Sequence, residues 1–76
     1  MKTVKISLSS VDNVKEFVGV VSRYSGDFDL GSSRYKVDAK SIMGIFSLDL
    51  SSPLTLEIHN DDEADDAKEK LKAFIL

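Results

Sequence analysis

The sequence predicts an α+β domain in which a four-stranded antiparallel sheet carries three helices on one face. Four segments alternate apolar and polar residues with a period of two, which is typical of strands with one buried side. Three other segments are predicted to be helices, two of them from apolar residues at helical spacing. The chain has 76 residues, which leaves room for one small core. We therefore expect a single domain over residues 1–76 with the element order β-α-β-β-α-β-α.

The first two elements are a strand and a helix. The strand is predicted over residues 3–8, where apolar and polar residues alternate. The helix is predicted over residues 11–23, because a start signal rich in Ser, Asp and Asn precedes an apolar stripe. Gly19 inside this helix is expected to permit close packing on the sheet. The stripe consists of Val11, Val14, Phe17, Val18 and Val21.

A hairpin and a short apolar helix occupy the middle of the chain. Residues 28–30 and 35–39 alternate on either side of a Gly-Ser-Ser-Arg turn, which predicts a hairpin. Ser41 is a good N-cap for a short helix over residues 42–48. Pro53 ends that segment, because proline cannot continue a helix.

A fourth strand and a final helix complete the fold. The strand is predicted over residues 54–58, and Asn60 is expected to cap the helix. The first turns of this helix are acidic and its last turns carry lysines, which complements the helix dipole. The acidic run is therefore interpreted as a helix N-terminus rather than a cation site. The predicted buried stripe is Ala64, Ala67, Leu71 and Phe74 or Ile75.

Composition excludes several classes of function. The net charge is −3 with a pI near 4.9, and the Lys and Arg residues are scattered, so nucleic acid is not an expected partner. No stretch is long and apolar enough to cross a membrane, and no apolar signal core follows the N-terminus, so we expect a cytoplasmic protein. Cysteine is absent and histidine occurs once, so no metal site and no cofactor are predicted.

One segment of the chain resembles a known family. Residues 40–44 read Lys-Ser-Ile-Met-Gly, after a predicted hairpin and at the start of a short helix. This run resembles the HPr family of sugar-transport phosphocarriers. The likeness extends to Ser-Arg-Tyr at residues 22–24 and to Asp-Phe-Asp-Leu at residues 27–30, and the element order is that of HPr. The resemblance implies an HPr-like open-faced β-sandwich, with the outer face of the sheet exposed to water.

The family's carrier motif departs from its pattern here. In HPr proteins, a Gly-x-His-Ala-Arg-Pro run begins the first helix, and the helix amides and the arginine hold a phosphoryl group on the histidine. Counting back from Ser41, the histidine position falls on Ser10 and the arginine position on Asp12. A carboxylate repels the phosphoryl dianion by about 1 kcal/mol or more at surface dielectrics. The resemblance therefore implies a degenerate carrier site in which Ser10 serves as a helix cap.

The region around Ser41 keeps the family's pattern. Ser41 matches the serine that a dedicated ATP-dependent kinase phosphorylates in many Gram-positive relatives, and it is a candidate for the same modification. Phosphoserine at a helix N-terminus is also electrostatically favourable, so this role is compatible with capping. In the family, exposed apolar residues of the short helix contact partner proteins. Met43 and Phe46 are the expected contacts, with Lys40 as a further candidate.

No catalytic constellation is recognisable, and the protein is not expected to be an enzyme. His59 is predicted on the wet face of the fourth strand, at the end of the sheet opposite the start of the first helix. It therefore cannot replace a carrier histidine, and it is interpreted as a polar surface residue. Asp27 and Asp29 are interpreted as solvated residues on the outer face of a strand.

Three functions are weighed on these grounds. The first is a non-enzymatic regulatory or interaction module, resembling HPr paralogues that lack the carrier histidine but keep the serine and act in carbon-catabolite control. The second is a phosphocarrier of the sugar phosphotransferase system that works through another residue. The third is a divergent scaffold domain without a transport role. The partners implied by the resemblance are HPr kinase, sugar phosphotransferase components or a transcription regulator, and the chain is expected to be a monomer.

Overall fold

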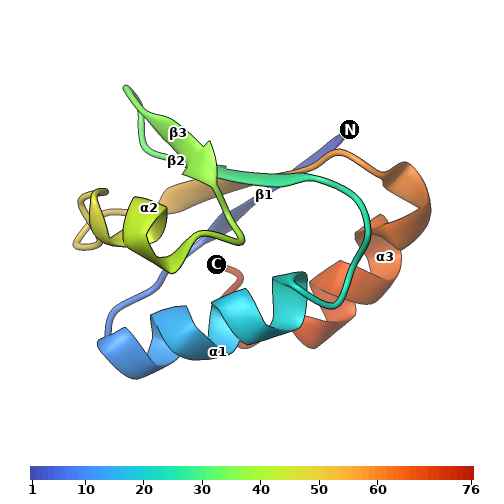
Figure 1. The fold of residues 1–76 in the computed structure, drawn as a ribbon, viewed down its shortest axis with the longest axis horizontal. Helices are drawn as coiled ribbons and strands as arrows, with labels where there is room; N and C mark the ends of the chain where they lie inside the picture. The colour runs from blue at the N-terminus through green and yellow to red at the C-terminus, as the bar shows by residue number, and fades with distance from the viewer.

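The computed structural model describes residues 1–76 and contains four strands and three helices in the predicted order (Figure 1). In chain order the elements are β1 Lys2–Ile6, α1 Val11–Val21, β2 Phe28–Gly31, β3 Lys36–Asp38, α2 Ile42–Phe46, β4 Leu54–Ile58 and α3 Asp61–Lys70.

The strands form one sheet in the order β1-β4-β2-β3, and every neighbouring pair is antiparallel. The helices lie on one side of this sheet, and its other face is open (Figure 1). Register sorts the side chains between the two faces because neighbouring residues in a strand point in opposite directions. The inward row across the sheet is Val4, Leu56, Leu30 and Val37, and the outward row is Thr3, Glu57, Asp29 and Asp38.

A single apolar core lies between the sheet and the helices. It contains 17 buried hydrophobic residues, and no polar or charged residue is buried with them. No buried side-chain polar atom lacks a hydrogen-bond partner. The four-stranded α+β fold predicted from the alternation of apolar residues is therefore confirmed, with one core as expected for a chain of this size.

Helix α1 differs from its prediction in three respects. It ends at Val21 rather than at residue 23, because the amides of Arg23 and Tyr24 bond three residues back in a tightened last turn. Val11, predicted in the buried stripe, is 54% exposed. Gly19 is also exposed, with nothing within 4 Å of a Cβ placed there, so the expectation that it packs closely on the sheet is wrong.

The C-terminal segment returns to the sheet. After α3 the chain makes a turn, and Ile75 then forms an isolated antiparallel bridge with Ile6 on the free side of β1. The amide of Leu76 donates to the carbonyl of Lys5 at 3.0 Å. Phe74 is buried against Phe17 with the rings in an edge-to-face arrangement. No helix in the structure is long and apolar enough to span a membrane.

Candidate functional site

The start of α2 is built on Ser41. Its side-chain oxygen accepts a hydrogen bond from the amide of Gly44 at 3.1 Å, and its backbone is extended, as an N-cap requires. The carbonyl of Ser41 accepts the amide of Ile45. Gly44 fits closely here, because a Cβ at this position would lie 3.2 Å from the Val37 side chain. The predicted capping role of Ser41 is thus confirmed, because its hydroxyl oxygen pairs with a first-turn amide that has no partner within the helix.

Lys40 makes contacts within the protein through both its side chain and its backbone. Its ammonium group donates to the carbonyl of Tyr24 at 2.7 Å and lies 5.8 Å from the centre of the Phe28 ring. Its amide donates to the Asp38 side chain at 2.9 Å. Lys40 therefore connects the segment before α2 to the turn that follows α1, and its ammonium group already has a carbonyl partner within the protein.

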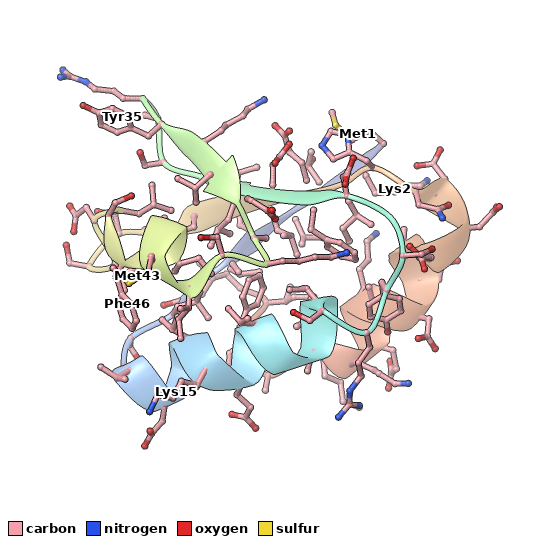
Figure 2. The ribbon with its side chains drawn as sticks, viewed as in Figure 1. Met1, Lys2, Lys15, Tyr35, Met43 and Phe46 are labelled. Carbon is pink, nitrogen blue, oxygen red and sulfur yellow. The ribbon has the colours of Figure 1, made fainter.

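Met43 and Phe46 form an exposed apolar patch on α2, which we call the α2 patch. Met43 is 77% exposed and Phe46 42% exposed, whereas Ile45 is fully buried. The two exposed residues are three positions apart, so they share one face of the helix. In Figure 2 they project from α2 on the side that faces the N-terminal part of α1. The expectation of one or two exposed apolar residues in this segment is met.

The start of α1 has the same capping geometry as α2 but different neighbours. The side-chain oxygen of Ser10 accepts the amide of Asn13 at 3.1 Å. Asn13 in turn accepts from the amide and hydroxyl of Ser9. Asp12 is exposed in the first turn, where no cationic side chain pairs with it. Ser10 is thus a structural cap beside an unpaired carboxylate.

The only histidine lies far from this position. His59 follows β4, whose Ile58 pairs with Lys2 at the beginning of β1, whereas α1 starts beyond the other end of β1. The prediction that His59 and Ser10 occupy opposite ends of the sheet is therefore confirmed.

The sequence interpretation missed a cluster around His59. Its Nε2 atom lies 2.9 Å from Asp29 Oδ2 and 3.8 Å from Glu57 Oε1. Asp29 and Glu57 are direct cross-strand partners on the outer face. The alternation in β4 already placed Glu57 and His59 on one face, but only the strand register brings Asp29 beside them. Asp29 is thus paired rather than simply solvated.

The loop between α1 and β2 is held by two acidic side chains of α3. Glu63 accepts from the amides of Gly26 at 2.9 Å and Ser25 at 3.1 Å, and these bonds hold the pKa of its carboxyl below the usual range. Desolvation and the hydrogen bond to Asp66 raise the pKa of the Tyr24 hydroxyl to about 12. Gly26 is required by this contact, because a Cβ there would lie 2.6 Å from the Asn60 side chain.

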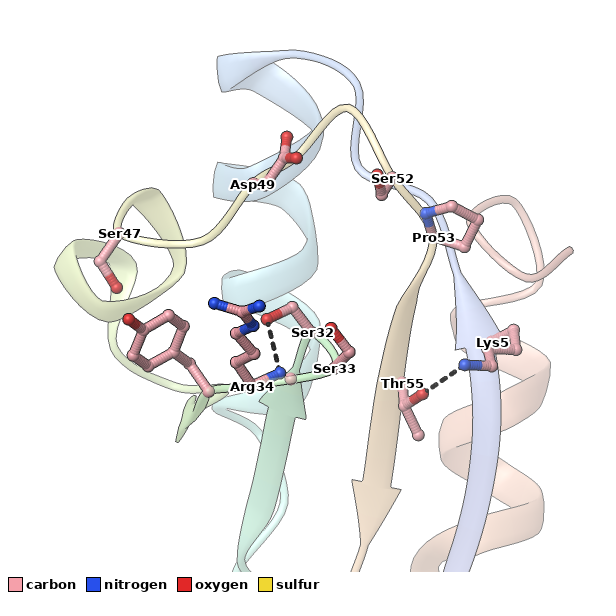
Figure 3. A pocket seen from close by; sticks show the side chains of 11 residues that line it. Lys5, Ser32, Ser33, Arg34, Ser47, Asp49, Ser52, Pro53 and Thr55 are labelled. Atoms are coloured by element: carbon pink, nitrogen blue, oxygen red, sulfur yellow. Dashed lines mark hydrogen bonds between the residues drawn. The ribbon is translucent and has the colours of Figure 1, made fainter.

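A hollow of about 530 Å³ opens between the hairpin turn and the loop from α2 to β4 (Figure 3). Its cations are Lys5, which donates to Thr55 at 2.8 Å, and Arg34. Its single carboxylate, Asp49, has a lowered pKa because the hydroxyl and amide of Ser51 donate to it. The hollow contains no histidine and a single carboxylate. The lining residues are Lys5, Gly31, Ser32, Ser33, Arg34, Tyr35, Ser47, Asp49, Ser52, Pro53 and Thr55.

Comparison with known proteins defines the class. The family model described as "PTS HPr component phosphorylation site" matches residues 11–76. HPr-C-His from Thermoanaerobacter tengcongensis is 32% identical with a TM-score of 0.81, over 96% of this chain and 89% of that chain. The phosphocarrier protein HPr from Bacillus anthracis is 30% identical with a TM-score of 0.72, over 99% and 94%. No curated protein matches the chain.

A third similar structure is that of a swapped dimer. The catabolite repression protein Crh from Bacillus subtilis, which was solved as a domain-swapped, intertwined dimer, is 34% identical with a TM-score of 0.68, over 90% of this chain and 79% of that chain. With the family model and these likenesses together, the chain belongs to the HPr family and is related to the sugar phosphotransferase system.

Proposed function

We propose that this HPr-family protein is a non-enzymatic regulatory and interaction module that acts through the Ser41 region and does not carry phosphate at α1. The observation that carries the proposal is the contrast between the single histidine and the start of α1. His59 is at the opposite end of the sheet, so no imidazole can reach the amides of the first turn of α1.

The electrostatics of the α1 start support the same proposal. Ser10 occupies the position that corresponds to the carrier histidine when the chain is counted back from Ser41, and Asp12 occupies that of the arginine. An arginine would attract a phosphoryl dianion, whereas the unpaired Asp12 carboxylate repels it. A phosphate ester on Ser10 would also be a poor donor, because it lacks the reactive phosphorus–nitrogen bond of phosphohistidine.

The α2 start has the features that a regulatory surface needs. The first turn of α2 contains no acidic side chain that would repel a phosphoryl group on Ser41. The amides at a helix N-terminus also favour a negative charge. The α2 patch supplies flexible and aromatic contact area close by. The roles divide accordingly: Ser41 is the candidate phosphorylation site, Met43 and Phe46 contact the partner, and Lys40 positions the segment. HPr kinase, phosphotransferase components or a transcription regulator are the partners in this proposal, and the cytoplasm is where they would meet it.

The test is incubation with an HPr kinase and ATP, followed by intact-mass analysis. The proposal expects one added phosphoryl group on the native chain and none on Ser41→Ala, with Ser47→Ala as a matched control that is still modified. An unchanged mass of the native protein removes phosphorylation as the switch. The interaction role is then tested by capture of partners on immobilised native protein and on a Met43→Ala, Phe46→Ala double variant. Equal capture by both removes the α2 patch as the contact surface.

Family membership alone favours a second candidate, a phosphocarrier that uses another residue. Transfer from phosphoenolpyruvate through enzyme I would leave an acid-labile label on such a protein. A scaffold without a transport role is the remaining alternative, and it predicts that neither phosphotransferase components nor a transcription regulator are captured. The expected monomer is tested by light scattering, because the similar protein Crh was solved as a dimer.

A further inference from the structure

We propose that Asp29, Glu57 and His59 form a binding site for a divalent transition-metal ion on the open face of the sheet. The three side chains each offer one ligand atom, and these atoms lie within 4.8 Å of one another. The site is separate from the α2 patch and from the start of α1, so the inference does not depend on the proposed function.

Strand register builds the site. Asp29 of β2 and Glu57 of β4 are directly paired across the sheet, and both point to the open face. His59 follows two residues after Glu57, so the alternation along the strand places it on the same side. The two carboxylates are therefore held together by backbone pairing rather than by flexible loops.

The distances fit a small ion. Zinc binds imidazole nitrogen and carboxylate oxygen at about 2.0–2.2 Å, which places two ligand atoms of a tetrahedral ion about 3.4 Å apart. Here Nε2 of His59 is 2.9 Å from Asp29 Oδ2 and 3.8 Å from Glu57 Oε1. Shifts of about half an ångström bring each of these two pairs to the tetrahedral spacing, and the ligand atoms of Asp29 and Glu57 lie within 4.8 Å of each other. Solvent would complete the coordination.

The charge on this face favours a cation. Like charges directly opposite each other in a sheet are destabilising. Asp38 pairs with Asp29, which pairs with Glu57, so three carboxylates lie in one row across neighbouring strands. Lys36 is the one ammonium group paired with this row, at 2.8 Å from Glu57 Oε2. That contact orients the Glu57 carboxylate and leaves Oε1, the atom closer to His59, available to an ion.

Ligand chemistry selects the kind of ion. An imidazole with two carboxylates suits zinc and similar first-row metals better than calcium or magnesium, which prefer oxygen ligands alone. The metal would take the lone pair of Nε2, so the bound imidazole is neutral and carries its proton on Nδ1. Because the chain has a single histidine and no cysteine, an ion that binds imidazole or thiolate ligands can do so only at His59.

The test is titration of the tag-free protein with Zn²⁺, followed by calorimetry and by NMR of the single imidazole. The proposal expects one ion per chain and a shift of the His59 ring signals on binding. His59→Gln and Asp29→Asn are expected to weaken binding about tenfold or more. Asp38→Asn removes a carboxylate of the same row without removing a ligand, and it is expected to bind nearly as the native chain does.

A thermal measurement keeps the test independent of the spectroscopy. Zn²⁺ is expected to raise the Tm of the native protein, because an ion that binds only the folded state stabilises it, and to leave the Tm of His59→Gln unchanged. The proposal is overturned if Zn²⁺ gives neither heat nor a ring shift in the native protein. It is also overturned if His59→Gln binds as tightly as the native chain.

Discussion

The starts of α1 and α2 are capped in the same way and are surrounded by different chemistry. In each, a serine oxygen accepts the amide three residues ahead at 3.1 Å, from Asn13 at Ser10 and from Gly44 at Ser41. At α1 the next residues include the unpaired carboxylate of Asp12. At α2 no acid stands in the first turn, and the α2 patch is exposed beside it. A helix start can thus keep its structural serine while the surrounding charge determines whether it suits phosphate.

The largest effect is expected from converting the α1 start back to a phosphate-binding one. Ser10→His together with Asp12→Arg supplies an imidazole and a cation beside the first-turn amides. We expect this double variant to gain an acid-labile label from enzyme I and phosphoenolpyruvate, where the native chain gains none. Ser10→His alone, which keeps the Asp12 carboxylate, is expected to label more weakly. Equal labelling of the single and double variants would show that Asp12 does not matter.

The apolar residues at the two starts should differ in their effect on binding. Met43→Ala and Phe46→Ala are each expected to lower kcat/KM of an HPr kinase for Ser41 by about tenfold, because truncating one of the few residues that dominate an interface costs more than about 1 kcal/mol. Val11, which is 54% exposed at the α1 start, provides the matched control, and Val11→Ala is expected to leave kcat/KM unchanged. The 77% exposure of Met43 predicts a stability change within about 0.5 kcal/mol for Met43→Ala. A uniform loss in all three variants would contradict the assignment of the surface.

The two caps, by contrast, should contribute equally to stability. Ser10→Ala and Ser41→Ala each remove one side-chain acceptor for a first-turn amide, which costs about 1 kcal/mol and lowers the Tm by about 4–8 °C in a domain of this size. Ser33→Ala, in the exposed hairpin turn, is the control and is expected to change the Tm little. Calorimetry of the three variants measures this. A Tm loss at only one of the two starts would break the structural equivalence.

The smallest effect is expected at Glu63, which accepts hydrogen bonds from the loop between α1 and β2. The folded-state pKa of Glu63 is lowered, so its contribution to stability is present above its unfolded-state pKa of about 4.3 and is lost as the pH falls through the folded-state value. Glu63→Gln is therefore expected to lower the Tm at neutral pH and to match the native protein in strong acid. Thermal unfolding across this pH range measures the difference, with the exposed Glu16→Gln as control. A Tm difference that persists in strong acid would assign the effect to packing rather than to charge.

The sequence predicted local features well and long-range ones poorly. Alternation in residues 54–58 and the capping serines depend on near neighbours, and the structure agrees with both. The predicted end of α1 lies two residues beyond the observed one, because a last turn with tightened hydrogen bonds has no clear residue signature. The cluster of Asp29 with Glu57 and His59 depends on strand register, which no single segment reveals. Likewise, no pattern in the sequence near Lys40 indicates that its ammonium group donates to the carbonyl of Tyr24.

The most direct measurement is the mass of the native protein after incubation with enzyme I and phosphoenolpyruvate, before and after brief acid treatment. An authentic HPr in the same reaction shows that the enzyme is active. The contrast between the two helix starts predicts an unchanged mass for this chain, because the α1 start offers a serine and a carboxylate where a carrier needs an imidazole and a cation. A stoichiometric, acid-labile phosphoryl group on this protein would contradict the account.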